Sequence, residues 1–265
     1  MSARSVAQAC RAVLVAAAPA DKVKAARAAA RDWRLGRLAF DFDVAMPDRP
    51  ARPDKPELLA PNRMPKRGKG SEHGRIALIH AITHIEFSAI DLAFDAVGRF
   101  GGEFPRGFTT DWMRVGGDEA MHFALLDRRL KNLGSFYGAM PAHDGLWDAA
   151  AGTAHDSLAR LAVVPMVLEA RGLDVTPAMI ERFSSVDDAV TRRILTRILN
   201  DEIRHVSAGT VWFESRCREK GLVPETTWHA LVKRHYRGLI KPPFNDSARS
   251  SAGLSRDYYQ ALAVQ

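Results

Sequence analysis

A short motif, Glu-x-x-His, occurs twice in this chain and constrains the fold more than any other feature. The first copy is Glu119 with His122, and the second is Glu202 with His205. On an α-helix, residues three apart lie on the same face, so each pair predicts a carboxylate and an imidazole directed at one point. A single copy of such a pair is more often solvated than metal-bound, so the prediction of a metal site depends on the repetition.

A further glutamate precedes each copy at the same interval. Glu86 stands 33 residues before Glu119, and Glu169 stands 33 residues before Glu202. All four glutamates fall among apolar residues of predicted helices, where unpaired carboxylates would be costly. The sequence thus contains the pattern Glu, then Glu-x-x-His, written twice with equal spacing.

Four carboxylates and two imidazoles in a helical bundle form the ligand set of di-iron and di-manganese carboxylate proteins. Two divalent cations would offset the mutual repulsion of the carboxylates. Oxygen donors with one imidazole per metal favour iron, with manganese as the alternative, over a thiolate-bound structural zinc. We predict two iron ions held by six side chains: Glu86, Glu119, His122, Glu169, Glu202 and His205.

Four other polar residues lie close to these ligands in the sequence. Asp118 and Asp201 each precede a ligand glutamate, and they are predicted to accept the second N–H of a ligating imidazole, with an exposed acid as the alternative. His80 and His84 stand one helical turn apart before Glu86. We expect them to be extra ligands, proton carriers or buried polar residues.

The apolar pattern predicts an all-α protein, because no β-strand pattern of convincing length appears. Ser71 is the expected cap of the first long helix, Thr110 and Asp111 are cap candidates for the second, and Pro165 should kink the third. Gly172 is expected to interrupt the third helix, and Thr176–Pro177 to start a short new one. The four long helices are predicted over 71–100, 109–133, 146–171 and 186–220.

The predicted domains are an N-terminal helical extension (1–46), a Pro-rich basic linker or strap (47–70), a four-helix bundle (71–221) and a C-terminal helix with tail (222–265).

Bulk composition points to an ordinary globular protein. The net charge is +7, with 38 basic against 31 acidic residues, and the excess is spread along the chain. The two cysteines have no metal-site or disulfide spacing, which favours a cytoplasmic location. The Ala-rich stretch 12–20 is too short to span a membrane, and its pattern continues through Arg31, which argues against a signal peptide. We therefore expect no membrane span.

The six ligands resemble those of the ferritin-like di-iron carboxylate superfamily, and the string from Asp201 to His205 is similar to that of bacterial multicomponent monooxygenase hydroxylases. The stretch from Pro47 to Phe244 is similar to an uncharacterised bacterial ferritin-like family of unknown function. The strings that carry this second likeness are 141–147 (PAHDGLW), 168–174 (LEARGLD) and 242–245 (PPFN). The resemblance implies a ferritin-like four-helix bundle and metal ligation, and it names no substrate.

Three functions follow as hypotheses. The first is an O2-dependent oxidoreductase, hydroxylase- or monooxygenase-like, that needs O2, an electron donor and a small-molecule substrate of unknown identity. The second is an iron-binding or ferroxidase protein without an organic substrate, which the basic composition disfavours. The third is a tRNA-linked hydroxylase that holds nucleic acid through the basic strap and the cluster Lys233–Arg237, although such charge runs are usually solvated faces. The oligomeric state stays open.

Overall fold

The computed structural model describes residues 4–65 and 71–264, and the regular structure in these ranges is helical. The all-α class is thereby confirmed for the described part of the chain. Extended pairing in that part is limited to isolated bridges, such as the one between Leu58 and Ala142. The chain forms two compact units, Met1–Asp148 and Ala149–Gln265. The predicted four-part domain scheme stays a prediction, and the last residues of its strap, 66–70, lie outside the described ranges.

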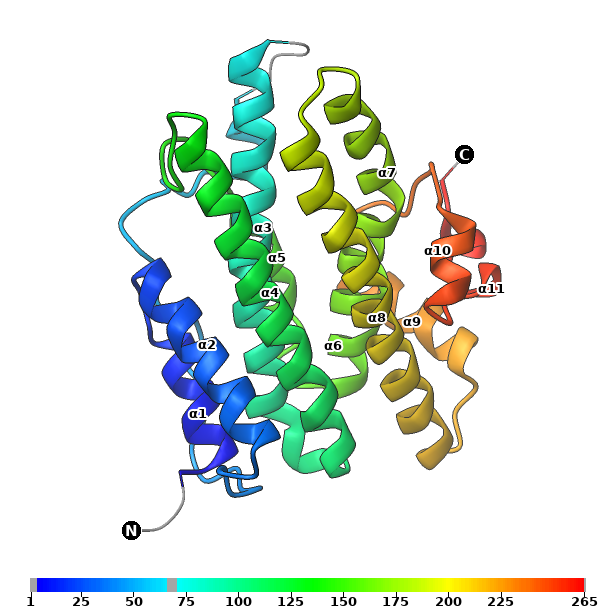
Figure 1. The fold of residues 1–265 in the computed structure, drawn as a ribbon. Helices are drawn as coiled ribbons and strands as arrows, with labels where there is room; N and C mark the ends of the chain where they lie inside the picture. Colours follow the sequence, from blue (N-terminus) through cyan, green and yellow to red (C-terminus); the bar gives the residue numbers. More distant parts are fainter. Residues whose placement is uncertain (1–3, 66–70, 265) are drawn as a thin grey trace. The chain divides into compact units, whose positions relative to one another are not determined.

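The first unit is built on two long antiparallel helices, α3 and α4, which pack along each other (Figure 1). Two shorter helices pack against this pair, with α1 against α3 and α2 against α4. The helices of this unit are α1 (Val6–Leu14), α2 (Pro19–Arg34), α3 (Glu72–Phe100) and α4 (Arg106–Asn132), with short 3-10 turns at Pro61–Arg63 and Gly101–Glu103.

Local sequence explains where α3 begins and how closely α4 approaches it. The Ser71 hydroxyl accepts a hydrogen bond from the Gly74 amide at 3.0 Å, as predicted for the N-cap. Gly116 of α4 faces the ring of Phe94, and a Cβ at this position would lie 2.5 Å from that ring. The missing side chain therefore lets the two helices approach closely enough to bury the groups between them.

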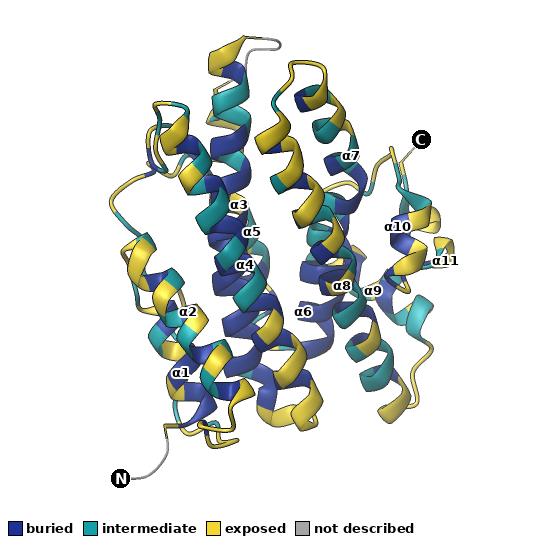
Figure 2. Cartoon of the chain, viewed as in Figure 1, coloured by how far each residue is buried: buried dark blue, intermediate teal, exposed yellow. Residues whose placement is uncertain are grey.

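Helix α3 is the most deeply buried helix of the first unit (Figure 2). Together with the following turn, Glu72–Glu103, it is long and apolar enough to cross a membrane by length and composition alone. Sequence analysis considered only the stretch 12–20 and overlooked this one. However, 72% of its most apolar window is buried inside the protein, as in the core helix of a soluble globular protein.

The strap, as far as it is described, runs over the first unit in extended form. Leu59 donates a backbone hydrogen bond to the Ala142 carbonyl at 2.8 Å, and the Ala142 amide donates to Glu57 at 2.9 Å. Ala51 donates to the Leu14 carbonyl at 2.8 Å. These bonds attach a proline-rich segment that has little helical structure of its own.

The second unit is built on the pair α7 and α8, with short helices α9 to α11 toward the C-terminus (Figure 1). A π-helical segment precedes α7 and also packs against α8. The helices are α5 (Gly145–Ala151, which crosses the boundary between the units), α6 (Ser157–Val163), the π-helix (Val164–Glu169), α7 (Ala170–Ser184), α8 (Ala189–Glu219), α9 (Pro224–His235), α10 (Asp246–Ser251) and α11 (Arg256–Tyr259), with a 3-10 turn at Gln260–Leu262.

The structure corrects several predicted helix limits. The predicted third helix is broken, because Asp156 caps a new helix with its carboxylate accepting from the Leu158 amide at 2.8 Å. Pro165 lies in the π-helix, and α7 then continues without interruption past Gly172 and Pro177. The second long helix begins at Arg106 rather than near residue 109, so that Thr110 and Asp111 are interior residues of α4 and not caps.

Candidate metal centre

The first unit brings together Glu86 from α3 with Glu119 and His122 from α4. All three are buried, with exposures of 4%, 1% and 0%. His122 Nδ1 lies 3.1 Å from Glu86 Oε2 and 3.4 Å from Glu119 Oε2. The ligand atoms of the three side chains lie within 4.8 Å of one another, so one ion could contact all of them.

The chemistry of this donor set fits a divalent transition-metal ion. Two carboxylates held this close in a buried site repel each other unless a proton or a cation intervenes. Carboxylate oxygen with neutral imidazole suits iron or manganese, and neither cysteine lies on α3 or α4. The pairing of α3 with α4 and the three-residue spacing on α4 together produce the geometry.

The second unit holds the other Glu-x-x-His pair on α8. His205 Nδ1 lies 3.3 Å from Glu202 Oε1, and the two residues are 1% and 8% exposed. Glu169 is half-buried at the last position of the π-helix. A π-helical segment of this kind often occurs at a functional site, because it changes the direction of the side chains next to it.

A glycine of α8 lets the π-helix pack against that helix. A Cβ at Gly209 would lie 2.4 Å from Pro165 Cβ, so only glycine fits at this distance. Gly209 stands two helical turns after Glu202, and Pro165 stands about one turn before Glu169. The close contact therefore fixes the segment that carries Glu169 against the helix that carries Glu202.

The two aspartates before the ligand glutamates have different surroundings. Asp201 is 2% exposed and accepts hydrogen bonds from two arginines of its own helix, Arg204 and Arg197, the latter at 2.5 Å. Asp118 is half-buried at the edge of a groove between α2 and α4. Their predicted role beside the imidazoles stays a prediction.

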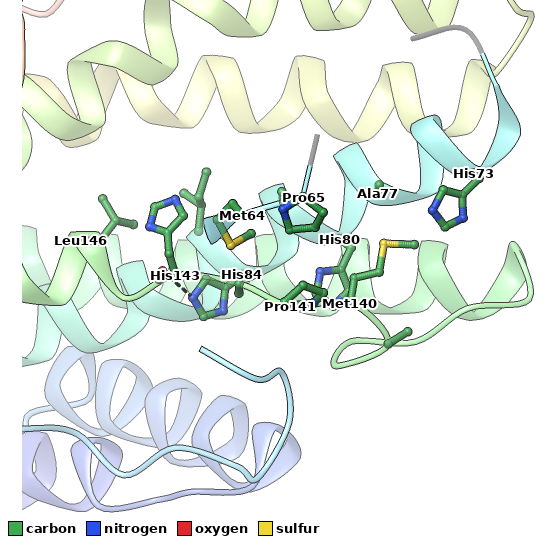
Figure 3. A pocket seen from close by; sticks show the side chains of 14 residues that line it. Met64, Pro65, His73, Ala77, His80, His84, Met140, Pro141, His143 and Leu146 are labelled. Atoms are coloured by element: carbon green, nitrogen blue, oxygen red, sulfur yellow. Dashed lines mark hydrogen bonds between the residues drawn. The ribbon is translucent and has the colours of Figure 1, made fainter. Parts of the chain in front are cut away.

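His80 and His84 line a cavity in the first unit, and both are almost fully buried (Figure 3). His84 Nε2 donates to the His143 carbonyl at 3.2 Å, and its Nδ1 lies 2.9 Å from the Tyr137 hydroxyl. Burial, followed by the nearby Arg52 cation, lowers the pKa of His84 to about 4. The ring is therefore neutral, and Nδ1 accepts from Tyr137. His80 Nε2 accepts from the Gly138 amide at 2.9 Å.

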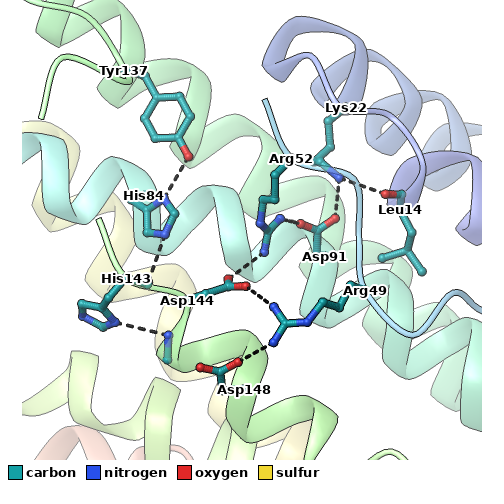
Figure 4. A network of polar contacts seen from close by, with 11 residues as sticks. Leu14, Lys22, Arg49, Arg52, His84, Asp91, Tyr137, His143, Asp144 and Asp148 are labelled. Carbon is teal, nitrogen blue, oxygen red and sulfur yellow. Dashed lines mark hydrogen bonds and ion pairs between the residues drawn. The ribbon is translucent and has the colours of Figure 1, made fainter. Parts of the chain in front are cut away.

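One turn beyond Glu86 on α3, a buried ion network connects the strap to the helices (Figure 4). Lys22 of α2 lies 2.6 Å from Asp91, and neither side chain is exposed. Arg52 of the strap binds the other oxygen of Asp91 and also reaches Asp144 at 3.3 Å. Burial lowers the pKa of Lys22 and raises that of Asp91, and the attraction between the two opposes both effects.

Sequence reasoning missed this network and the role of Tyr137. The available signal was a charged residue, Asp91, in a strongly apolar stretch, which requires a buried partner. Its partners stand 69 and 39 residues away in the sequence, and no local pattern identifies them.

These features define a helical protein with a buried cluster of glutamate and histidine side chains that can hold a metal ion. The chain belongs to the family described as "Protein of unknown function (DUF455)", whose model matches residues 15–260. It is similar to an uncharacterised protein of Haemophilus influenzae, with 43% identity over 212 residues, which cover 78% of this chain and 74% of that protein. No solved structure matches.

Proposed function

We propose that the chain is a di-iron carboxylate protein that uses O2 to oxidise an organic substrate. The observation that carries this proposal is the buried set Glu86, Glu119 and His122, with ligand atoms within 4.8 Å of one another. Two glutamates and a histidine, Glu169, Glu202 and His205, recur at the same sequence intervals in the second unit. We propose that both sets contribute to one ferritin-like centre of four carboxylates and two imidazoles.

The roles of the side chains follow from this arrangement. Glu86, Glu119, Glu169 and Glu202 would supply the carboxylate ligands that offset the charge of the ions, and His122 and His205 would supply the imidazole ligands. The iron pair supplies the O2-reducing chemistry that amino-acid side chains lack. Hydroxylation of a C–H bond by O2 also consumes two electrons and two protons and releases water, so a separate electron donor is required.

The chain's own contribution is to hold the ligands and to exclude water. Ile82 and Ile90 lie one helical turn on either side of Glu86, Val115 and Phe123 lie one turn on either side of Glu119, and all four are buried. An apolar lining of this kind keeps water from a reactive centre. It also strengthens the interaction of the carboxylates with bound cations, because the local dielectric constant is low.

Metal content tests the central claim. Protein produced with iron should contain close to two iron ions per chain, as measured by elemental analysis, and Glu119→Ala or Glu202→Ala should lose most of them. Glu181→Ala, a change of the same type at an exposed position of α7, should retain both. Absence of bound metal after anaerobic loading with Fe(II) would remove the proposal, and two manganese ions would change only the identity of the metal.

The rival function in the same class is iron handling without an organic substrate. The reduced, iron-loaded protein should consume O2 in either case. Turnover that increases when a small-molecule extract is added supports the oxidoreductase. Turnover that depends on added Fe(II) alone supports a ferroxidase.

One observation favours the third hypothesis, a role linked to nucleic acid. A groove of about 800 Å³ between α2 and α4 is lined by five exposed arginines. Arginine forks suit phosphate groups. Arg49 and Arg52 of the strap bind aspartates, and Arg31 of the groove likewise pairs with Asp32. Asp111 and Asp118 also line the groove, so its net charge is smaller than the number of its arginines. The arginines of the groove are Arg27, Arg31, Arg34, Arg106 and Arg114.

A further inference from the structure

The first unit contains a cavity of about 320 Å³ between α3, the end of the described strap and the loop after α4 (Figure 3). This volume falls at the lower end of the range of roughly 300–1,000 Å³ for small-molecule sites. Alanines on two sides leave the space open: Ala77 and Ala81 from α3, and Ala139 and Ala142 from the loop.

The wall of the cavity is apolar apart from four histidines, His73, His80, His84 and His143. Methionine, proline, leucine and isoleucine side chains form much of the lining, and among the lining residues that the structure describes there is no Asp, Glu, Lys or Arg. A charged ligand would lose its hydration here without gaining an opposite charge. The cavity therefore suits an uncharged organic group.

The polar groups in the wall are held in place before any ligand arrives. The rings of His80 and His84 lie within 25° and 21° of the plane of Tyr137, which also bonds to His84. His143 Nδ1 accepts from the Gly145 amide at 3.3 Å, so the ring carries its hydrogen on Nε2. The cavity thus offers flat ring surfaces and a hydrogen-bond donor that is already oriented, which fits a planar ligand with an acceptor oxygen or nitrogen.

The cavity opens on the side of α3 that faces away from the metal ligands. Ala77 and Ala81 precede Glu86 by nine and five residues. At about 100° per residue, they lie roughly 180° and 140° around the helix from Glu86. A ligand enclosed here is therefore separated from Glu86 by the width of the helix.

We propose that this cavity is a binding site for an uncharged, planar organic molecule, distinct from the metal centre. The site goes beyond the proposed di-iron function, because its occupant does not contact the metal ligands. It provides a place for an accessory molecule, such as a small carrier or effector, next to the helix that carries Glu86.

Binding of two probes with the same ring tests the proposal. Calorimetric titration of the full-length protein with 1-naphthol, which is uncharged at neutral pH, should show saturable binding of one molecule per chain. The anionic 1-naphthoate should bind at least tenfold more weakly. Equal binding of the two probes, or no saturable binding of 1-naphthol, would overturn the assignment.

Two variants locate the bound probe. Ala81→Phe should fill the cavity and weaken binding by at least tenfold, whereas Ala178→Phe, the same change at an exposed position of α7, should leave it unchanged. His143→Leu should weaken binding by about fivefold, through loss of one hydrogen bond. Unchanged binding by a folded Ala81→Phe protein would refute the site. Iron analysis of the same samples is a separate readout, so loss of the di-iron proposal would leave this result standing.

Discussion

The fully buried Asp91 carboxylate forms ion pairs with two cations, Lys22 and Arg52. Its partner Lys22 has no exposed side-chain surface and also donates to the Val13 carbonyl at 3.1 Å. Arg52 is only 15% exposed. A buried pair contributes little net stability by comparison with apolar residues of the same size, but removing one partner is expensive. The network therefore makes the position of the N-terminal helices and the strap sensitive to single residues.

We expect Asp91→Ala to lower the free energy of unfolding by about 3–5 kcal/mol, because Lys22 is left buried without a counter-charge. The double variant Lys22→Met/Asp91→Leu should lose much less. Asp127→Ala, which breaks a surface pair with Lys131, should cost less than about 1 kcal/mol. Urea denaturation measures all three, and a value for Asp91→Ala as small as that for Asp127→Ala would contradict the argument.

At the residue scale, sequence alone could identify the candidate ligands but not their surroundings. Glu119 with His122 is found from helical spacing, because both members lie on one element. The contact of Glu86 with His122 depends on how α3 packs against α4, which the spacing does not specify. The Tyr137–His84 bond joins residues 53 apart, and no sequence pattern indicates it.

At the scale of the helices, tertiary contacts explain why a helix continues where the local sequence predicted its end. Gly172 and Pro177 are weak helix formers, yet α7 passes through both. Between them lies Asp174, which is buried and binds Arg249 of α10 through bonds of 2.8 and 2.7 Å. This ion pair with a residue distant in the sequence stabilises α7 at a point where low helix propensity would favour its end. Ser71, by contrast, was predictable because the cap is a local interaction.

Two glycines of the second unit give opposite predictions for the same substitution. Gly209→Ala should destabilise the protein by about 1–3 kcal/mol, because the new methyl group would overlap the rigid ring of Pro165. Gly172→Ala has open space and should be neutral or stabilising by up to about 1 kcal/mol. Thermal and urea unfolding of both variants provide the comparison. The packing account fails if Gly209→Ala is as stable as Gly172→Ala.

For the molecule as a whole, the net charge of +7 is spread along the chain, but five arginines line one groove. The arginines of the groove between α2 and α4 include three on one stripe of α2, at positions 27, 31 and 34. The groove is lined by exposed side chains of α2 and α4, where a long polyanion could bind. Binding of nucleic acid to arginines depends on salt, because each phosphate contact releases counterions.

If the groove binds RNA, the triple variant R27A/R31A/R34A should weaken tRNA binding and reduce the salt dependence by about two to three units of slope. The triple variant K233A/R234A/R237A removes the same charge from α9 and the residues after it, and it should have a smaller effect. Fluorescence anisotropy over a range of salt concentrations measures both. Equal losses in the two variants would indicate a non-specific charge effect, and no binding by the unaltered protein would exclude the tRNA-linked role.

The two cysteines are distributed so that each compact unit contains one. Cys10 lies in α1 and Cys217 in α8, and both are fully buried. Burial raises the pKa of both thiols, to about 11 for Cys217, so neither forms a reactive thiolate in the folded chain. A thiol-specific reagent can therefore modify either residue only after the surrounding unit opens. The labelling rates of Cys10 and Cys217 would therefore report separately how fast each unit opens. Because both residues are native, the measurement needs no introduced probe.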